Sequence, residues 1–186
     1  LEFRSIIQKG GPRVRLFLIS KQREAISLAI IALLLSAVAI AADQVIKMLV
    51  TANIKLNDQV PVIKGFFKIF YIQNNGAAFG MLQNQIWLFV LITLSISAAI
   101  IVALFKYENH EFFSYTASIL IVGGGIGNLI DRVVRGYVID YISISFFPWI
   151  FNFADCCVTV GTVFLIIHIL FFAERDGKSE KVIRSR

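Results

Sequence analysis

The chain has 186 residues, of which 58% are hydrophobic and 16% are charged, and its mean hydropathy is +0.77. A soluble domain has about 25% charged residues, so this composition excludes an ordinary soluble globular protein and indicates an integral membrane protein. The net charge of +6 does not point to nucleic acid. Most basic residues flank apolar runs, where they suit anionic lipid headgroups, so membrane lipid is the expected partner.

Four uncharged runs are long enough to cross a hydrocarbon core of about 30 Å at about 1.5 Å per helical residue. In chain order they are Ala25–Ala42, Ile86–Phe105, Phe112–Ile130 and Cys156–Ala173. We therefore predict an integral membrane protein that is mainly α, with four transmembrane helices.

The Lys and Arg residues lie unequally on the two sides of these spans. The N-terminal segment, the second loop and the C-terminal tail together hold 12 of them, and the first and third loops hold 6. Cytoplasmic segments carry the excess of positive charge, so we expect both termini in the cytoplasm.

The first and third loops should therefore be extracytoplasmic, and both contain strand-like sequence. In the first loop, residues 47–85, the stretch Val60–Gln73 is rich in Val, Ile, Phe and Tyr, and Asn75-Gly76 predicts a tight turn. In the third loop, Tyr137–Ser145 is a second strand-like run. We predict that these segments pair into a small extracytoplasmic β-sheet on the outer membrane surface.

One membrane domain accounts for most of the chain. We assign residues 1–24 to a cytoplasmic N-terminal extension, 25–173 to a four-helix domain that includes the segment 47–85, and 174–186 to a cytoplasmic tail.

Polar residues gather where the spans meet the extracytoplasmic side. Charged residues at helix ends are often solvated anchors, and for any one of them that interpretation stays open. The convergence of many polar residues at one membrane depth favours a functional site. The residues are Asp43, Asn74, Asn128, Asp131, Arg132, Asp140, Asn152 and Asp155.

Asp140 and Asp155 are the candidates for a general acid and base. Each lies at the edge of an apolar run, where an ionised carboxylate at bilayer depth costs about 2.5–3.5 kcal/mol, so their presence needs a reason. Two carboxylates held close together share a proton, because one pKa rises. The ionised partner can then activate a water while the protonated partner polarises a carbonyl, which is the chemistry of aspartyl proteases.

Other catalytic arrangements fit the sequence poorly. His110 lies in the cytoplasmic loop, and His168 is 13 residues beyond Asp155, or about 20 Å along a helix, which argues against a Ser-His-Asp triad at the outer face. No spacing typical of a zinc site is present, and we expect neither metal nor cofactor. Cys156 and Cys157 are sequence neighbours, too close for an ordinary disulfide, and are interpreted as packing residues.

Two further patterns have structural interpretations. The glycines at 123, 124, 125 and 127 lie within an apolar span with no preceding strand, which indicates close helix packing and not a phosphate loop. Asp131 and Arg135 have the spacing of a salt bridge if the third helix continues past Ile130.

In this order, the polar motifs resemble the signature blocks of lipoprotein signal peptidases, also called signal peptidase II. The resemblance covers about Ile26–Phe172. The blocks are Asp43-Gln44 to Lys47; Asn74-Asn75-Gly76-Ala77-Ala78-Phe79; Gly127-Asn128-Leu129-Ile130-Asp131-Arg132 continuing to Gly136, Val138 and Asp140; and Asn152-Phe153-Ala154-Asp155.

The resemblance implies a bacterial inner-membrane aspartyl endopeptidase that removes the signal peptide of prolipoproteins whose lipobox cysteine carries a diacylglyceryl group. It makes Asp140 and Asp155 the catalytic dyad and the small sheet the family's cradle on the membrane surface. It also implies inhibition by cyclic peptide antibiotics such as globomycin, bound at the dyad. The positions that would line or support the pocket are Asp43, Asn74, Gly76, Asn128, Arg132, Asn152 and Ala154.

Two other classes of function were weighed. A small ion-coupled transporter would also place acidic groups among four helices, but usually near the midplane, where these spans have none. A purely structural membrane subunit explains the helices and leaves the clustered Asp and Asn residues unexplained.

Overall fold

The structure, a computed structural model, describes residues 11–76, 85–106 and 110–171. The predicted C-terminal tail and part of the predicted N-terminal extension lie outside these ranges, as do residues 77–79 of the second signature block. In chain order the elements are α2 (Pro12–Asn53), β1 (Gln59–Ile63), β2 (Phe67–Asn74), α3 (Ile86–Lys106), α4 (Phe112–Arg135), β3 (Val138–Ile144), β4 (Ile150–Phe151) and α5 (Phe153–Phe171).

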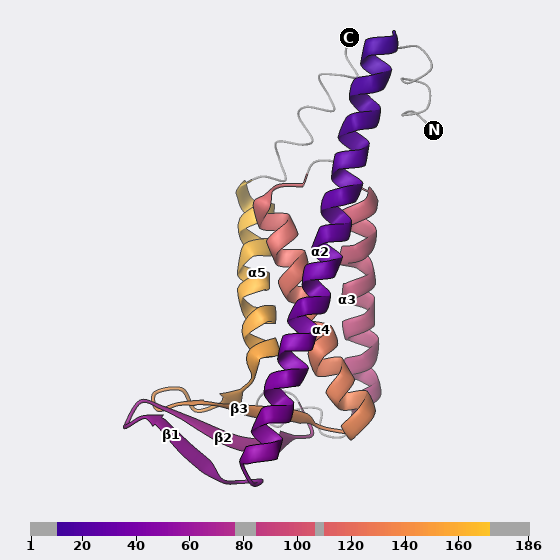
Figure 1. Ribbon diagram of the computed structural model, residues 1–186. Helices are drawn as coiled ribbons and strands as arrows, with labels where there is room; N and C mark the ends of the chain where they lie inside the picture. Colours follow the sequence, from indigo (N-terminus) through magenta and orange to yellow (C-terminus); the bar gives the residue numbers. More distant parts are fainter. Residues whose placement is uncertain (1–10, 77–84, 107–109, 172–186) are drawn as a thin grey trace.

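The predicted helical membrane fold is confirmed. Within the described residues, four helices are long and apolar enough to cross a membrane. They form a bundle in which α4 packs against α2, α3 and α5, and the small sheet projects sideways from one end (Figure 1). The Pro12 end of α2 lies at the opposite end of the bundle from the sheet.

Glycines in α4 allow its neighbours to approach closely, as the sequence predicted. A Cβ atom on Gly123 would lie 2.8 Å from the Cβ of Ala39 in α2. A Cβ on Gly124 would overlap the backbone carbonyl oxygen of Ala154 in α5. Because helix association in a membrane depends on close packing, these positions place α4 at the centre of the bundle.

The first helix is longer than predicted at both ends. We expected a span over Ala25–Ala42 followed by a loop from Lys47, but α2 continues to Asn53, and its 42 residues would extend about 63 Å. The charged residues that suggested a helix end are instead paired inside it: Lys47 lies one turn after Asp43, and the two form a buried salt bridge of 2.7 Å. Lys47 is therefore a helix residue and not a loop charge.

The third helix also runs past its predicted end at Ile130, as far as Arg135. Gly136 then ends it with φ of +82°, a left-handed conformation that glycine adopts at little cost. This extension brings Asp131 and Arg135 onto one helical face, where they form the salt bridge that their spacing predicted.

The sheet is antiparallel, with strand order β1-β2-β3-β4. The predicted pairing of the two loop segments is confirmed, because β2 pairs with β3. The stretch 60–73 forms short strands, as expected: β1 and β2 are separated by a turn at Gly65, whose φ is +76°. The two-residue strand β4 was not predicted.

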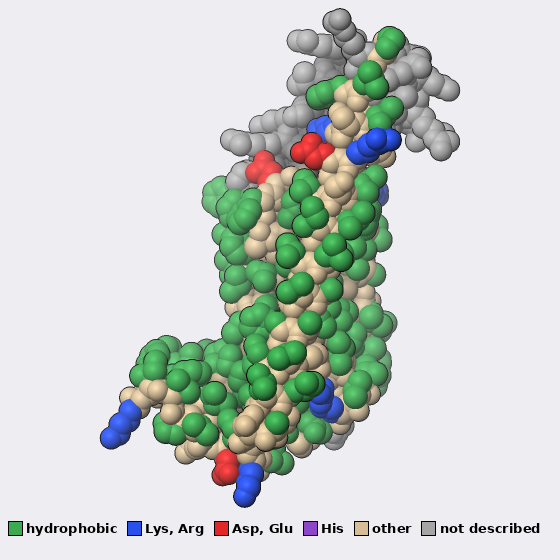
Figure 2. Space-filling view, viewed as in Figure 1, with side chains coloured by type: hydrophobic (Ala, Val, Ile, Leu, Met, Phe, Trp, Pro, Cys, Tyr) green, Lys and Arg blue, Asp and Glu red, His purple; other side chains and the backbone are tan. Residues whose placement is uncertain are grey.

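An apolar cluster joins the sheet to the end of α2. Val50 of α2 packs with Tyr71 of β2 and with Ile139 and Tyr141 of β3, and all four are buried. The cluster therefore anchors the middle of the sheet to the bundle. On the face shown in Figure 2, charged side chains lie near the two ends of the molecule, and the bundle between them is covered with hydrophobic side chains.

Candidate active site

Asp140 is buried where the sheet meets the bundle, with 1% of the residue exposed. It lies on β3 opposite Ile72 of β2. The Nδ2 of Asn74, at the end of β2, donates to its Oδ2 over 2.8 Å, and the Nδ2 of Asn152 donates to its Oδ1 over 2.6 Å. Both carboxyl oxygens therefore accept a hydrogen bond from an asparagine amide.

Asn74 is itself held by the predicted turn. Its Oδ1 accepts a hydrogen bond of 3.0 Å from the backbone N–H of Gly76, a side-chain turn typical of asparagine. This bond directs the other end of the amide toward Asp140. Gly76 is buried. Because it bonds to Asn74, and Asn74 bonds to Asp140, Asn74 and Gly76 both lie beside the site.

Asp155 lies in the first turn of α5 and takes part in its N-terminal cap. Asn152 precedes the helix, and its Oδ1 accepts a bond of 2.9 Å from the backbone N–H of Asp155. In return, the backbone N–H of Asn152 donates to the Oδ2 of Asp155 over 3.0 Å. This reciprocal pair is a capping box, and it fixes the position of the Asp155 carboxylate.

Asn128 of α4 connects the two aspartates. Its Nδ2 donates to the Oδ1 of Asp155 over 2.8 Å, and its Oδ1 accepts from the Nδ2 of Asn152 over 3.1 Å. Because Asn152 also donates to Asp140, two amides join the carboxylates, which come from β3 and α5. We call Asp140 and Asp155 the carboxylate pair.

Four charged residues behind the carboxylate pair form what we call the ion cluster: Asp43, Lys47, Asp131 and Arg135. The ammonium of Lys47 lies 2.7 Å from Asp43 and 2.8 Å from Asp131, and Arg135 pairs with Asp131. With all four ionised, the charges of the ion cluster sum to zero. A buried charge is tolerated only when it is paired and hydrogen-bonded, and this condition is met here.

Backbone amides connect the ion cluster to the elements that carry the carboxylate pair. The N–H of Ala154, next to Asp155, donates to Asp43 over 3.2 Å, and the N–H of Ile139, next to Asp140, donates to Asp131 over 3.2 Å. The ion cluster therefore holds the start of α5 and the start of β3 against α2 and α4.

Arg132 is not part of the ion cluster. Its guanidinium lies over the ring of Phe89 in α3, 4.5 Å from the centroid, and its Nη1 lies 3.5 Å from the carbonyl oxygen of Asn128. It is half-buried. The salt bridge to Asp131 is made by Arg135, one turn further along α4.

The environment of Asp140 disfavours its charge. The pKa of Asp140 is raised from its ordinary value of 3.8 to about 7. Burial is the larger cause, and the negative charge of Asp155 is the second. The hydrogen bonds from Asn74 and Asn152 oppose the rise. Near neutral pH the pair can therefore hold one proton and one negative charge, which suits it to act as an acid and a base together.

The structure brings together every predicted site residue: Asp43, Asn74, Gly76, Asn128, Arg132, Asp140, Asn152, Ala154 and Asp155. Prediction missed the part played by Lys47, which we placed in a loop. The signal available was its spacing of four residues from Asp43, since a pair with this spacing can remain inside a helix.

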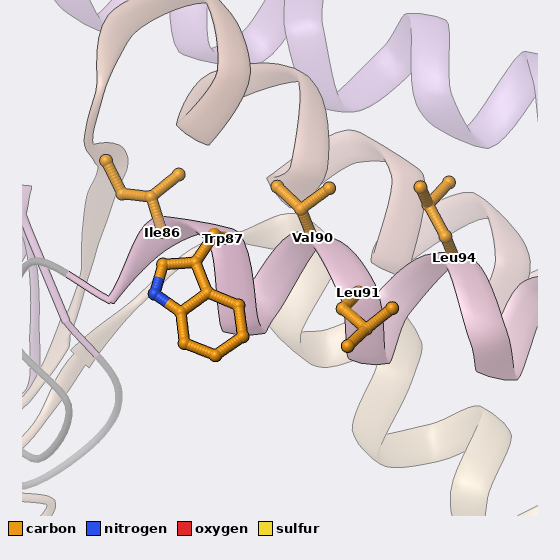
Figure 3. Close-up of a pocket in the computed structure, with 5 residues that line it drawn as sticks. All are labelled: Ile86, Trp87, Val90, Leu91 and Leu94. Atoms are coloured by element: carbon orange, nitrogen blue, oxygen red, sulfur yellow. The ribbon is translucent and has the colours of Figure 1, made fainter.

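Two other features do not form part of this site. An open apolar groove of about 700 Å³ runs along α3, lined by Ile86, Trp87, Val90, Leu91 and Leu94 (Figure 3). Cys157 is buried, and its Cβ lies where a Cβ on Gly124 would approach to 3.0 Å, as expected of a packing residue.

The fold and the site define a membrane protein of four helices, with a buried and a half-buried carboxylate, Asp140 and Asp155, at the end of the bundle that carries a small sheet. The family model for signal peptidase (SPase) II matches residues 35–171. The chain belongs to the signal peptidase II family, as its motifs indicated, and is therefore a protease.

Individual proteins agree with this assignment. The chain is 41% identical over 157 residues to the lipoprotein signal peptidase of Streptococcus thermophilus, covering 84% of this chain and 97% of the relative. It is 42% identical over 156 residues to that of Geobacillus thermodenitrificans, with 82% and 97% covered. It is 39% identical over 140 residues to that of Desulfitobacterium hafniense, with 75% and 93% covered.

Solved structures resemble the fold as well. One described as a bacterial membrane enzyme superposes with a TM-score of 0.70 at 34% identity, covering 75% of this chain and 87% of that one. A second with the same description gives a TM-score of 0.69 at 33% identity, covering 76% and 94%.

Proposed function

We propose that this protein is an aspartyl endopeptidase that cleaves the signal peptide from diacylglyceryl-modified prolipoproteins, on the N-terminal side of the lipobox cysteine. The observation that carries the proposal is the joining of Asp140 and Asp155 through Asn128 and Asn152. Family membership supplies the substrate class, and the carboxylate pair supplies a chemistry able to cut a peptide bond.

In the proposed reaction, Asp140 carries the shared proton and Asp155 is ionised in the resting enzyme. Asp155 takes a proton from a water molecule, whose oxygen attacks the carbonyl carbon of the scissile bond while Asp140 protonates the carbonyl oxygen. The tetrahedral intermediate then loses the C–N bond, and the proton held by Asp155 passes to the leaving amine. Return of the proton from the intermediate hydroxyl to Asp140 restores the starting state.

The site belongs at the extracytoplasmic face of the bacterial cytoplasmic membrane. The Pro12 end of α2 and the Lys106 end of α3 lie away from the sheet, and the basic residues there favour the cytoplasm. Lys47, which we counted among the charges on the other side, is buried in the ion cluster, so the charge asymmetry between exposed segments is larger than the sequence count.

Lipid should contribute to recognition. The substrate carries its diacyl chains next to the scissile bond, so those chains can stay in the bilayer beside the apolar surface of the bundle while the peptide reaches the carboxylate pair. A cyclic peptide antibiotic such as globomycin should compete for the same position.

The test is cleavage by the purified protein in detergent of a prolipoprotein with and without the diacylglyceryl group. We expect a loss of mass equal to the signal peptide from the lipidated substrate, slow or absent cleavage of the unmodified one, and none with an Asp140→Asn variant. If the Asp140→Asn variant cleaved as fast as the wild type, the proposed dyad would be wrong. If the lipidated substrate stayed intact with folded wild-type protein, the proposed function would be wrong.

A further inference from the structure

Lys47 makes a contact that charge balance alone does not require. It is fully buried on α2, and its third ammonium hydrogen points to the side-chain oxygen of Asn128, 2.9 Å away, after Asp43 and Asp131 have accepted the other two. An ammonium has three donors and no acceptor, so all its capacity is used. The contact links the ion cluster to the amide that joins the carboxylate pair.

The orientation of that amide decides which groups it can serve. As it stands, the Nδ2 of Asn128 donates to Asp155, and its Oδ1 accepts from Asn152 and Lys47. A half-turn would set its oxygen against a carboxylate oxygen of Asp155 and its NH₂ against that of Asn152. In the turned amide, both of these contacts put like groups together. Only the observed orientation therefore serves both aspartates.

Lys47 also occupies the two anions that would otherwise attract the amide. Its ammonium touches Asp43 and Asp131 as well as the oxygen of Asn128, so the ammonium lies between the two carboxylates and the Asn128 amide. Without the ammonium, those carboxylates would attract the NH₂ of Asn128, because hydrogen bonds to an ionised acceptor are the stronger ones. The amide would turn away from Asp155.

We propose that Lys47 is a positioning residue of the carboxylate pair: through Asn128 it holds the amide that serves Asp155 and, by way of Asn152, Asp140. The inference rests on the proposed function for its catalytic consequence, but the positioning can be measured without substrate. The positive charge of Lys47 also lowers the pKa of Asp140.

The charged groups that face this region come from each packed element. Asp43 lies on α2, Asp131 and Arg132 on α4, Asp140 on β3 and Asp155 on α5. Of these, Asp131 can be neutralised without touching Asn128 or the carboxylate pair directly. This makes possible a comparison in which Asp131 is neutral in both variants and the difference is the ammonium of Lys47, with its contacts to Asp43 and Asn128.

The experiment compares Asp131→Asn with Lys47→Met/Asp131→Asn. Both lack the charge of Asp131, and only the double variant lacks the ammonium. The double variant therefore avoids the net negative charge that Lys47→Met alone would leave in the ion cluster. The single variant is the reference, so that any loss of kcat caused by Asp131→Asn itself is common to both proteins. We expect kcat of the double variant to fall at least about tenfold with KM within about twofold, since the loss is in positioning and not in substrate contact.

The substrate-free readout is the titration of the Asp140 carboxyl, followed by NMR on protein labelled with ¹³C at aspartate carboxyls and assigned by its absence in Asp140→Asn. The pKa of Asp140 measured in this way should be higher by at least about half a pH unit in the double variant than in the single variant. Arg135→Met/Asp131→Asn is the matched control, because it removes the other cation of the ion cluster in the same background. Arg135 does not contact Asn128, so this control should keep the titration of the single variant.

If the folded double variant kept the kcat and the titration of the single variant, Lys47 would be only a structural counterion and the inference would be overturned. An equal shift in Arg135→Met/Asp131→Asn would overturn it too, since the effect would then come from the loss of any positive charge in the ion cluster. If the wild type failed to cleave the lipidated substrate, the proposed function would fail, and the titration would still decide the positioning role.

Discussion

Asn152 and Asp155 cap the first turn of α5 with two reciprocal hydrogen bonds, of 2.9 Å and 3.0 Å. The same Asn152 side chain donates to Asp140. A helix cap thus sets the positions of both carboxylates, which ties local folding of α5 to the proposed chemistry.

This cap makes Asp155→Asn an informative variant. The Oδ1 of an asparagine can still accept the N–H of Asn152, so α5 should keep its cap. Its NH₂ would face the NH₂ of Asn128, so we expect a modest loss of thermal stability in a protein that still folds. The negative charge that activates water is lost, and cleavage should fall by about 10²-fold or more. The measurement pairs the cleavage rate with the unfolding temperature in one detergent. Retention of more than about a tenth of the activity would contradict the role of Asp155.

The raised pKa of Asp140 predicts how stability changes with pH. The folded protein holds this proton up to about pH 7, whereas the unfolded chain releases it near 3.8. Between these values the folded state binds more protons, so the contribution of Asp140 to stability is full below the lower value and is lost as pH rises through the upper one.

Asp140→Asn should remove that part of the pH dependence, because an amide does not titrate. The unfolding temperature of the variant, measured from pH 4 to pH 8, should fall less with rising pH than that of the wild type. Parallel curves would show that Asp140 is not protonated in the folded protein at the lower end of this range.

Asn74→Ala should move the alkaline limb of the kcat/KM profile to higher pH, because Asp140 acts in its protonated form. The amide of Asn74 stabilises the ionised form of Asp140, so its loss raises the pKa of that carboxyl above about 7. The ratio of variant to wild-type activity should therefore be higher at pH 8 than at pH 6, since Asp140 of the variant keeps its proton to higher pH. Gln73→Ala is the control, since Gln73 is next to it on β2 but donates to the hydroxyl of Tyr71. A shift of equal size in both variants would argue against a direct effect of Asn74.

Gly124→Ala should destabilise the protein and displace Asp155. The added Cβ would overlap the carbonyl oxygen of Ala154, a backbone atom that can move only if the start of α5 moves. Overpacking of this kind costs about 1–3 kcal/mol.

The matched control is Gly125→Ala on the same helix, whose Cβ would meet only the side chain of Thr93, at 3.3 Å. We expect little loss there. The comparison uses the unfolding temperature and the cleavage rate of the two variants, and similar losses in both would mean that helix content and not packing against α5 is responsible.

Replacing Cys156 and Cys157 together with Ala should preserve cleavage within about twofold, with a loss of stability of about 1–2 kcal/mol from the smaller buried volume. The thiols have no part in the proposed chemistry. Thiol-alkylating reagents and zinc chelators should leave the rate of the wild type unchanged. Inhibition by a chelator that added zinc reverses would contradict a metal-free mechanism.

The sequence by itself determined the features that depend on local composition. Four uncharged runs predicted the four membrane helices, and the strand-like run Tyr137–Ser145 predicted β3, because hydrophobic length and side-chain type act over neighbouring residues. The clustering of Asp140, Asn152 and Asp155 near one face followed from topology, since the ends of adjacent spans must meet on the same side.

Tertiary structure alone decided the end of α2 and the partners of Lys47. Asp43 and Lys47 suggested that the first span had ended, since charges are costly in a membrane, but Asp131, far along the chain, pairs with the same ammonium and makes burial acceptable. The bond from Asn128 to Asp155 was equally hidden, because an amide carries no local sign of which distant carboxylate it will meet. Such pairings depend on how the helices pack, and packing is a property of the whole fold.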